Sequence, residues 1–113
     1  MTNKRLKEAR DCRDQAKAER RALLADADAE QRNALTVNRD KAHRAWMDAV
    51  NDGLARNSEA IEAAFTKAAA ANKKVRDAIA ADKMIVERIT KVTGSIDAVM
   101  ALTKASQDDQ SSG

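Results

Sequence analysis

The chain of 113 residues has no proline and no tyrosine, and it contains only three glycines, one cysteine and one histidine. Because Cys12 stands alone, an internal disulfide and a thiolate metal site are both excluded. No apolar run approaches the ~20 residues that a transmembrane helix needs. The basic N-terminus is not followed by the apolar segment of a secretory signal. We therefore expect an intracellular, cytoplasmic protein with no membrane span.

Residues that carry out catalysis are equally scarce. His43 lies between Ala42 and Arg44, and no carboxylate pair accompanies it at the spacing of metal ligands. None of the phosphate-loop, dinucleotide, zinc or nucleophile-elbow patterns is present. We therefore expect no enzymatic activity, no cofactor, no metal and no small-molecule substrate. His43 is expected to be a solvated surface residue.

What the chain does contain is alanine, charge and a helical period. Charged residues make up 35% of the sequence, and alanine supplies much of the hydrophobic 43%. From Leu54 to Met100, apolar residues recur at alternating steps of four and three, which places them along one side of a helix. This pattern predicts an all-α protein, built as a long antiparallel helical hairpin or a coiled-coil-like bundle that oligomerisation completes.

Glycine gives the predicted helix boundaries. Gly53 and Gly94 are the only glycines before the last residue, and glycine readily takes the left-handed conformation that ends helices. We predict a single helical domain over residues 1–105, with a polar, disordered tail over 106–113. Within it, we predict a helix over about 2–50, a turn at 51–53, a helix over about 54–92 and a short helical segment over about 95–105. Each arm of such a hairpin would be roughly 75 Å long at 1.5 Å per residue.

The two arms of this hairpin do not match in apolar content. The richest apolar stretch, residues 84–102, would face residues 4–20, where few side chains are apolar. Either the segment after Gly94 folds back as a third helix, or the C-terminal helices of several chains pack together. We favour self-association, because long apolar rows are rarely left exposed to water. The predicted interface, here called the apolar seam, contains Phe65, Val75, Ile79, Ile85, Val86, Ile89, Val92, Ile96, Val99 and Met100.

Two polar residues lie within the heptad pattern of the second arm. Asn72 occupies an a position, where it either pairs with a polar partner and fixes the register or lies at the edge of the seam. Asp82 interrupts the row of d positions, so regular zipper packing throughout is not expected.

A basic stripe runs along the N-terminal segment. Arg10, Arg13, Lys17 and Arg20 follow the same three-and-four spacing and share one side of the helix. Such a stripe suits a phosphate backbone or an acidic protein surface. The alternative is a solvated helix with local ion pairs, such as Lys7–Asp11 and Arg10–Asp14.

The lone tryptophan, Trp46, is either a partner anchor or a plug that closes the hairpin end against Leu54 and Ser58. Taken together, the sequence favours a non-enzymatic structural or protein-interaction module, such as an assembly subunit, an adaptor or a chaperone-like binder. This module would self-associate through residues 61–102, as a homo-oligomer or with a helical partner. A nucleic-acid-associated protein that uses the basic stripe is the alternative.

Overall fold

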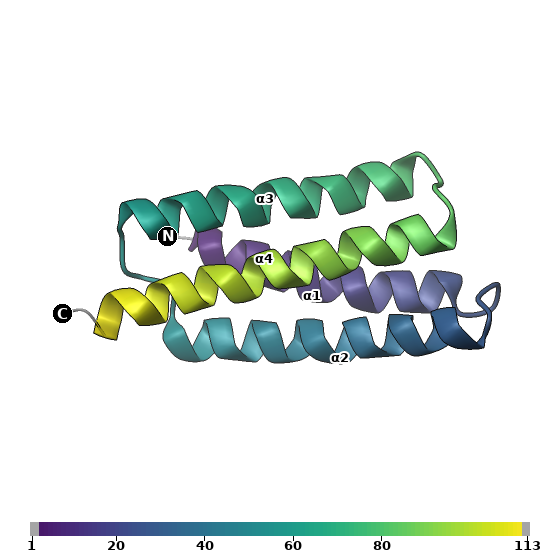
Figure 1. Cartoon of the computed structure of the whole chain (residues 1–113), viewed down its shortest axis with the longest axis horizontal. Coiled ribbons are helices and arrows are strands. Elements are labelled where there is room, and N and C mark those ends of the chain that lie inside the picture. Colours follow the sequence, from purple (N-terminus) through teal and green to yellow (C-terminus); the bar gives the residue numbers. More distant parts are fainter. Residues whose placement is uncertain (1–2, 112–113) are drawn as a thin grey trace.

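The computed structural model describes residues 3–111, and this part of the chain contains four α-helices and no strand. The helices run alternately in opposite directions along a body of 48 × 23 × 23 Å (Figure 1). The all-α prediction is confirmed. Because each predicted arm would be roughly 75 Å long, the chain must fold back more often than expected. The helices are α1 (Lys4–Leu23), α2 (Ala29–Asp52), α3 (Glu59–Ala80) and α4 (Ile85–Ser111).

The predicted uninterrupted helix over residues 2–50 is wrong, because α1 ends at Leu23 and α2 begins at Ala29. Asp28 starts α2 with a capping box: the backbone N–H of Gln31 donates to Asp28 Oδ1 at 2.8 Å, and the backbone N–H of Asp28 donates to Gln31 Oε1 at 3.0 Å. These two bonds satisfy backbone donors that a helix start leaves unpaired. The first arm is therefore an antiparallel pair of helices.

The second arm is divided in the same way, at a position without glycine or proline. α3 ends at Ala80, and Asp82 takes the left-handed conformation with φ 50°. The backbone N–H of Lys83 closes this end by donating to the carbonyl of Ala78 at 3.0 Å. Asp82 thus lies in the connection before α4, which explains why it interrupts the apolar row.

The predicted stop at 93–95 is wrong, because α4 passes through Gly94 without a break. Ser95 is not a cap: its side chain is 1% exposed and its hydroxyl donates to Asn72 Oδ1. The predicted disordered tail is corrected in part, since residues 106–111 continue α4, whereas 112–113 lie outside the described residues.

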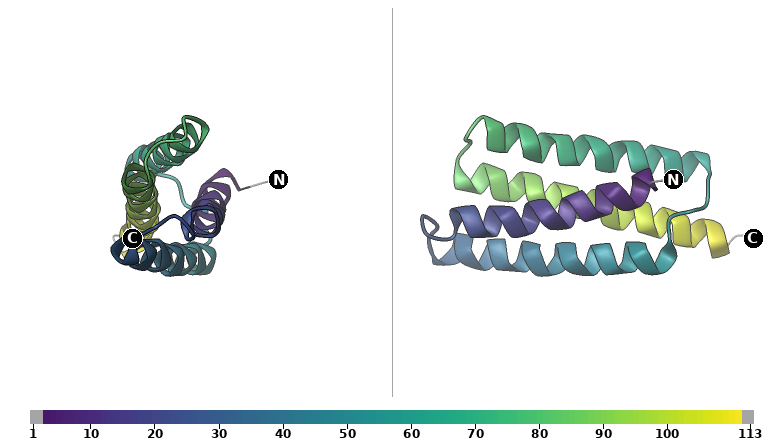
Figure 2. Two further views of the ribbon diagram at one scale, coloured as in Figure 1. Left: turned by 90° about the vertical axis from the view of Figure 1, so that its right-hand side faces the viewer. Right: turned by 180° about the vertical axis from the view of Figure 1, so that it is seen from behind.

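Gly53 follows the end of α2, with φ 85° in the left-handed region on which the predicted turn depends. The two helices that it joins, α2 and α3, nevertheless do not pack against each other within the described residues. Instead, the end-on view in Figure 2 shows α4 between α2 and α3, with α1 on the other side of the bundle. Trp46 is half-buried and packs against the central core, to which Leu54 also belongs. It lines a small pocket together with Leu6 of α1. The plug that closes a hairpin end therefore stays a prediction.

This arrangement buries most of the apolar seam inside one chain. Val75, Val92, Ile96 and Val99 are at most 2% exposed and belong to the central core. The inference that the C-terminal half of the seam lacks a partner within the chain is therefore wrong, because the extra folds bring α1, α2 and α3 around α4. Four other seam residues are half-buried, and two are exposed: Phe65, Ile79, Ile85 and Ile89, then Val86 and Met100.

Polar side chains join the helices within this core. Asn72, fully buried on α3, donates from Nδ2 to the Glu8 carbonyl at 2.9 Å and to Glu8 Oε2 at 2.7 Å on α1. Because its Oδ1 accepts from Ser95 of α4, it bonds to two other helices. Of the two alternatives for Asn72, the structure shows pairing with polar partners and not a place at the edge of the seam. Near the other end of the bundle, Arg88 of α4 makes a buried bidentate ion pair with Glu19 of α1.

Candidate polyanion-binding face

The predicted basic stripe lies on the side of α1 that adjoins α2. Arg13 places its guanidinium 5.0 Å from the centre of the Trp46 ring, and Arg20 Nε donates to Thr36 Oγ1 at 3.0 Å. The remaining members of the stripe, Arg10 and Lys17, are exposed. The structure therefore keeps all four predicted residues on one side of α1.

A second basic stripe comes from α2. Arg32, Thr36, Arg39, His43 and Trp46 follow each other at steps of four and three, so they share the side of α2 that contacts α1. Seen from behind in Figure 2, α1 and α2 lie next to each other along their length. We call this surface the basic face; it comprises Arg10, Arg13, Lys17 and Arg20 of α1, with Arg32, Arg39 and His43 of α2.

The α2 residues were missed because residues 2–50 were predicted to form one helix. In a single straight helix, Arg32 and Arg39 would lie farther along the axis than Arg20 and could not lie beside the stripe of the N-terminal segment. The signal that could have found them is the capping box of Asp28 and Gln31, an acceptor side chain followed three residues later by glutamine.

Several cations of the basic face have no carboxylate partner. Within residues 3–111, Arg10, Lys17, Arg20 and Arg32 form no ion pair, whereas Arg13 and Arg39 each bind the aspartate next in sequence. The predicted Lys7–Asp11 pair is present at 2.8 Å. The predicted Arg10–Asp14 pair is not, because Asp14 binds Arg13 at 2.9 Å. Four positive charges thus remain uncompensated on adjacent sides of two helices.

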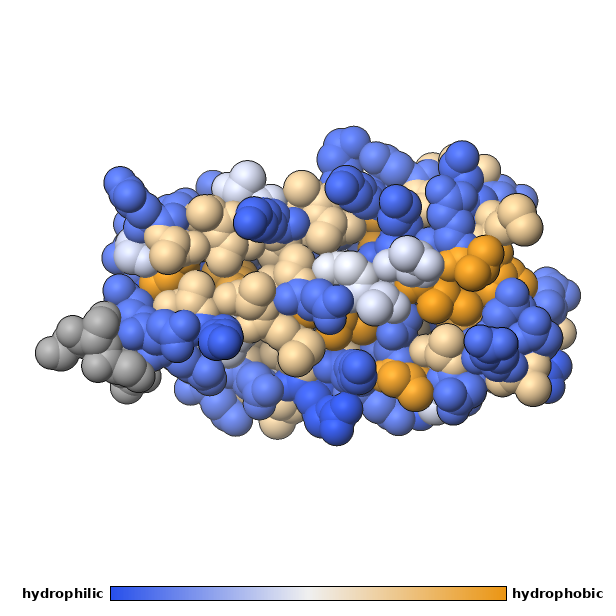
Figure 3. Space-filling model, in the orientation of Figure 1, coloured by the Kyte–Doolittle hydropathy of each residue, from blue (hydrophilic) through white to orange (hydrophobic). Residues whose placement is uncertain are grey.

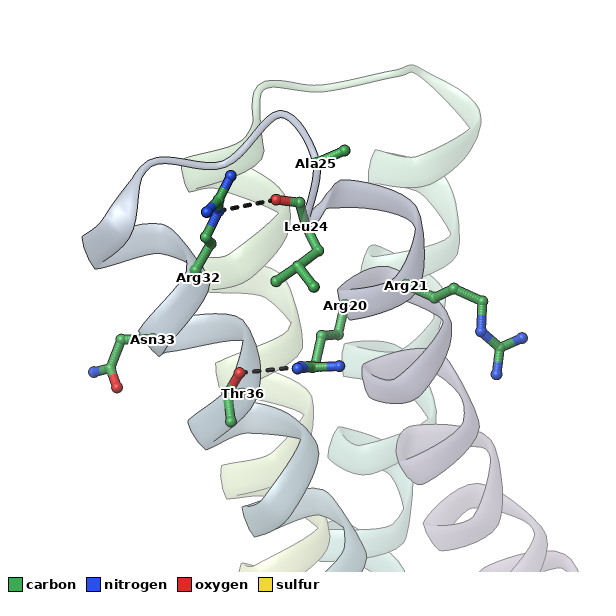
Figure 4. Close-up of a pocket in the computed structure, with 7 residues that line it drawn as sticks. All are labelled: Arg20, Arg21, Leu24, Ala25, Arg32, Asn33 and Thr36. Carbon is green, nitrogen blue, oxygen red and sulfur yellow. Dashed lines mark hydrogen bonds between the residues drawn. The ribbon is translucent and has the colours of Figure 1, made fainter.

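At one end of the basic face, a pocket of about 690 Å³ opens between the C-terminus of α1 and the N-terminus of α2. In Figure 4, Arg20 and Arg32 reach this region from opposite helices, with the Leu24 side chain between them, while Arg21 points away. Arg32 Nε donates to the Leu24 carbonyl at 3.1 Å. The pocket is lined by Arg20, Arg21, Leu24, Ala25, Arg32, Asn33 and Thr36.

Other chemistry-bearing residues are dispersed. No group of three or more His, Cys, Asp or Glu side chains in the described part of the chain is placed to hold a metal ion. Cys12 is 1% exposed, and burial raises the pKa of its thiol to about 11, against the smaller opposing effect of its hydrogen bond with Ser95. The thiol is therefore protonated near neutral pH, which makes it a poor nucleophile. His43 is exposed on the basic face.

None of the helices in residues 3–111 combines the length and apolar character needed to cross a bilayer. Comparison of the chain with protein-family models, with curated protein sequences and with solved structures finds no match.

Proposed function

We propose that this protein is a non-enzymatic helical binding module whose basic face binds the phosphate backbone of duplex DNA. The observation that carries the proposal is the alignment of two basic stripes, in which Arg10, Lys17, Arg20 and Arg32 have no carboxylate partner within residues 3–111. A cation without a carboxylate partner can bind a phosphate and release a solvent counterion, with no internal ion pair to break first. The stripe on α1 is roughly 15 Å long, which corresponds to about four base pairs.

Duplex is favoured over single-stranded nucleic acid because the face offers little for bases to stack on. Beside the imidazole of His43, the neighbouring aromatic ring in the described part of α1 and α2 is that of Trp46, and the guanidinium of Arg13 lies over it. Single-stranded binders usually stack successive bases on several aromatic side chains. An acidic protein surface is the competing partner, and the assay below separates the two by whether the duplex itself binds.

The test is fluorescence anisotropy with a labelled 20-base-pair duplex at several salt concentrations. If four phosphates are neutralised, log K falls with log salt at a slope of about −3.6, so affinity drops about 150-fold between 50 and 200 mM salt. The variant Arg10→Gln/Lys17→Gln removes two of the four cations and should halve this slope.

A matched control comes from α3. Lys67 and Lys74 are exposed and form no ion pair with any residue that the structure describes. They are also seven residues apart, so Lys67→Gln/Lys74→Gln removes the same charge with the same spacing. We expect the control to retain the slope of the unmodified chain. Equal losses in the two variants would mean that net charge alone drives binding. A binding constant insensitive to salt, or no binding to the duplex, would refute the proposal and favour a protein partner.

Self-association as a structural or protein-interaction module is the second candidate, and it rests on what remains of the apolar seam. Val86 is 57% and Met100 52% exposed, on one side of α4. Figure 3 shows apolar surface along the part of the molecule that α3 and α4 occupy in Figure 1. We expect Val86→Glu/Met100→Glu to convert a dimer to a monomer in light scattering at micromolar concentration; an unmodified chain that is already monomeric contradicts this candidate.

A further inference from the structure

The pocket between Arg20 and Arg32 has the donors of an anion site. Each guanidinium is held by one hydrogen bond from Nε, Arg20 to Thr36 and Arg32 to the Leu24 carbonyl. Within residues 3–111, the terminal Nη groups of both arginines make no hydrogen bond and no ion pair. A guanidinium fixed in this way presents its terminal N–H groups in a defined orientation, which suits bidentate binding of a phosphate.

Thr36 adds a further donor. Its Oγ1 accepts the hydrogen bond from Arg20, so the hydroxyl proton is available for an oxyanion. Two arginine forks and one hydroxyl thus line the same pocket, and these are donor types that bind the oxygens of a tetrahedral anion.

The helix dipole points to the same kind of ligand. Arg32 lies in the first turns of α2, where the positive end of the dipole disfavours a cation. Asp28 and Glu30 are nearby in sequence, but neither forms an ion pair with Arg32. A bound anion would interact favourably with both the arginine and the N-terminus of α2.

We infer that this pocket binds a phosphate monoester, a dianion with three free oxygens, and that the 5′-terminal phosphate of a duplex lying on the basic face is its source. The inference rests on the proposed function. The pocket lies at the end of the face, next to the connection of residues 24–28 that joins α1 to α2 (Figure 4). That position suits the end of a nucleic-acid strand better than its continuous interior. A small phosphorylated molecule is the other source of the same chemistry.

The first measurement is an NMR titration of the ¹⁵N-labelled full chain with inorganic phosphate, with the ionic strength held constant by sodium chloride. We expect saturable shifts confined to the amides of residues 20–36, and a loss of affinity of at least tenfold in Arg20→Gln/Arg32→Gln. Arg32→Gln alone, at an exposed position, gives the same readout if the double variant fails to fold. The control Lys67→Gln/Lys74→Gln should bind phosphate like the unmodified chain. Shifts spread over all helices, or unchanged affinity in the arginine variants, overturn the inference.

The second measurement compares duplexes with and without a 5′-phosphate. A preference of about fivefold for the phosphorylated end, abolished in Arg20→Gln/Arg32→Gln, supports the nucleic-acid source. If inorganic phosphate binds in the pocket but the end phosphate gives no preference, the source is a small molecule and the assignment to a strand end is overturned. If the duplex binds with the expected slope while phosphate leaves the pocket amides unchanged, the pocket inference fails and the proposed function stands. If phosphate binds and the duplex does not, the proposed function fails instead.

Discussion

We expect Arg88→Met to lower the free energy of unfolding by about 3–5 kcal/mol, the usual cost of leaving one partner of a buried ion pair alone. Arg88 donates from Nε to Glu19 Oε2 at 2.8 Å and from Nη2 to Glu19 Oε1 at 2.6 Å, which ties α4 to α1. The two residues are 8% and 3% exposed. A domain of this size has a total stability of about 6–17 kcal/mol, so the change removes a large part of it.

The reverse variant, Glu19→Leu, should cost less. Within residues 3–111, the carboxylate of Glu19 forms an ion pair with Arg88 alone, whereas Arg88 Nη1 also lies 3.4 Å from Oδ1 of Asp82, whose side chain is 96% exposed. Once Glu19 is gone, the long side chain of Arg88 can extend toward that exposed carboxylate and toward water. In Arg88→Met/Glu19→Leu both charges are absent, so the double variant should recover most of the stability that Arg88→Met loses.

The assay is urea unfolding followed by far-ultraviolet circular dichroism, with the four proteins forming a double-mutant cycle. The hydrogen bonds that Arg88 donates to Glu19 raise the pKa of Arg88 above its ordinary value, so the arginine stays charged at any pH used. A loss below about 1 kcal/mol in Arg88→Met, the value typical of an exposed pair, would refute the burial of this ion pair. A double variant as unstable as the sum of the single variants would refute the argument from the uncompensated charge.

Two further predictions concern glycine and cysteine. Gly53→Ala should lower the free energy of unfolding by about 1 kcal/mol, because φ is 85° at this position. Gly94 lies in a helix interior where an added Cβ meets nothing within 4 Å. Gly94→Ala should therefore raise the free energy of unfolding by about 0.5–1 kcal/mol in the same urea assay. The pKa of Cys12 rises from 9.0 to about 11 on folding, so the unfolded chain loses the thiol proton first. The contribution of this thiol to the free energy of unfolding is fully present below about pH 9 and is lost as pH rises to about 11. Urea unfolding at pH 8 and pH 10 should show this loss in the unmodified chain and not in Cys12→Ala.

The helical period was sufficient to predict an all-α fold, but it was not sufficient to predict the number of helices. The spacing of apolar residues indicates which side of a helix is buried. The same spacing continues across a connection when the next helix buries an equivalent side. The breaks depend on local backbone chemistry instead. Asp28 with Gln31 carried a readable capping signal, while the left-handed residue after α3 is Asp82, at a position where glycine is usual.

The glycine at 94 shows the opposite error. A lone glycine costs a helix only about 1 kcal/mol, and the burial of Val92, Ser95 and Ile96 on either side of it holds the helix together. Tertiary packing therefore overrides the local preference, and the packing itself depends on folds that the sequence did not reveal. The same dependence explains the site: four of its residues were readable as a stripe on one helix, but Arg32, Arg39 and His43 join them only after the chain reverses.

The net charge of the chain is only +3, so an overall excess of basic residues does not account for the basic face. The face is basic because two carboxylates of α1 lie on the opposite side of that helix. Glu8 and Glu19 lie on the side of α1 away from the stripe, where they bond to Asn72 of α3 and Arg88 of α4. Folding thus places two negative charges of α1 in the bundle and leaves Arg10 and Lys17 exposed to solvent. The interactions that hold α1 in the fold are therefore also those that separate its charges, so a polyanion that binds the stripe should favour the folded chain over the unfolded one.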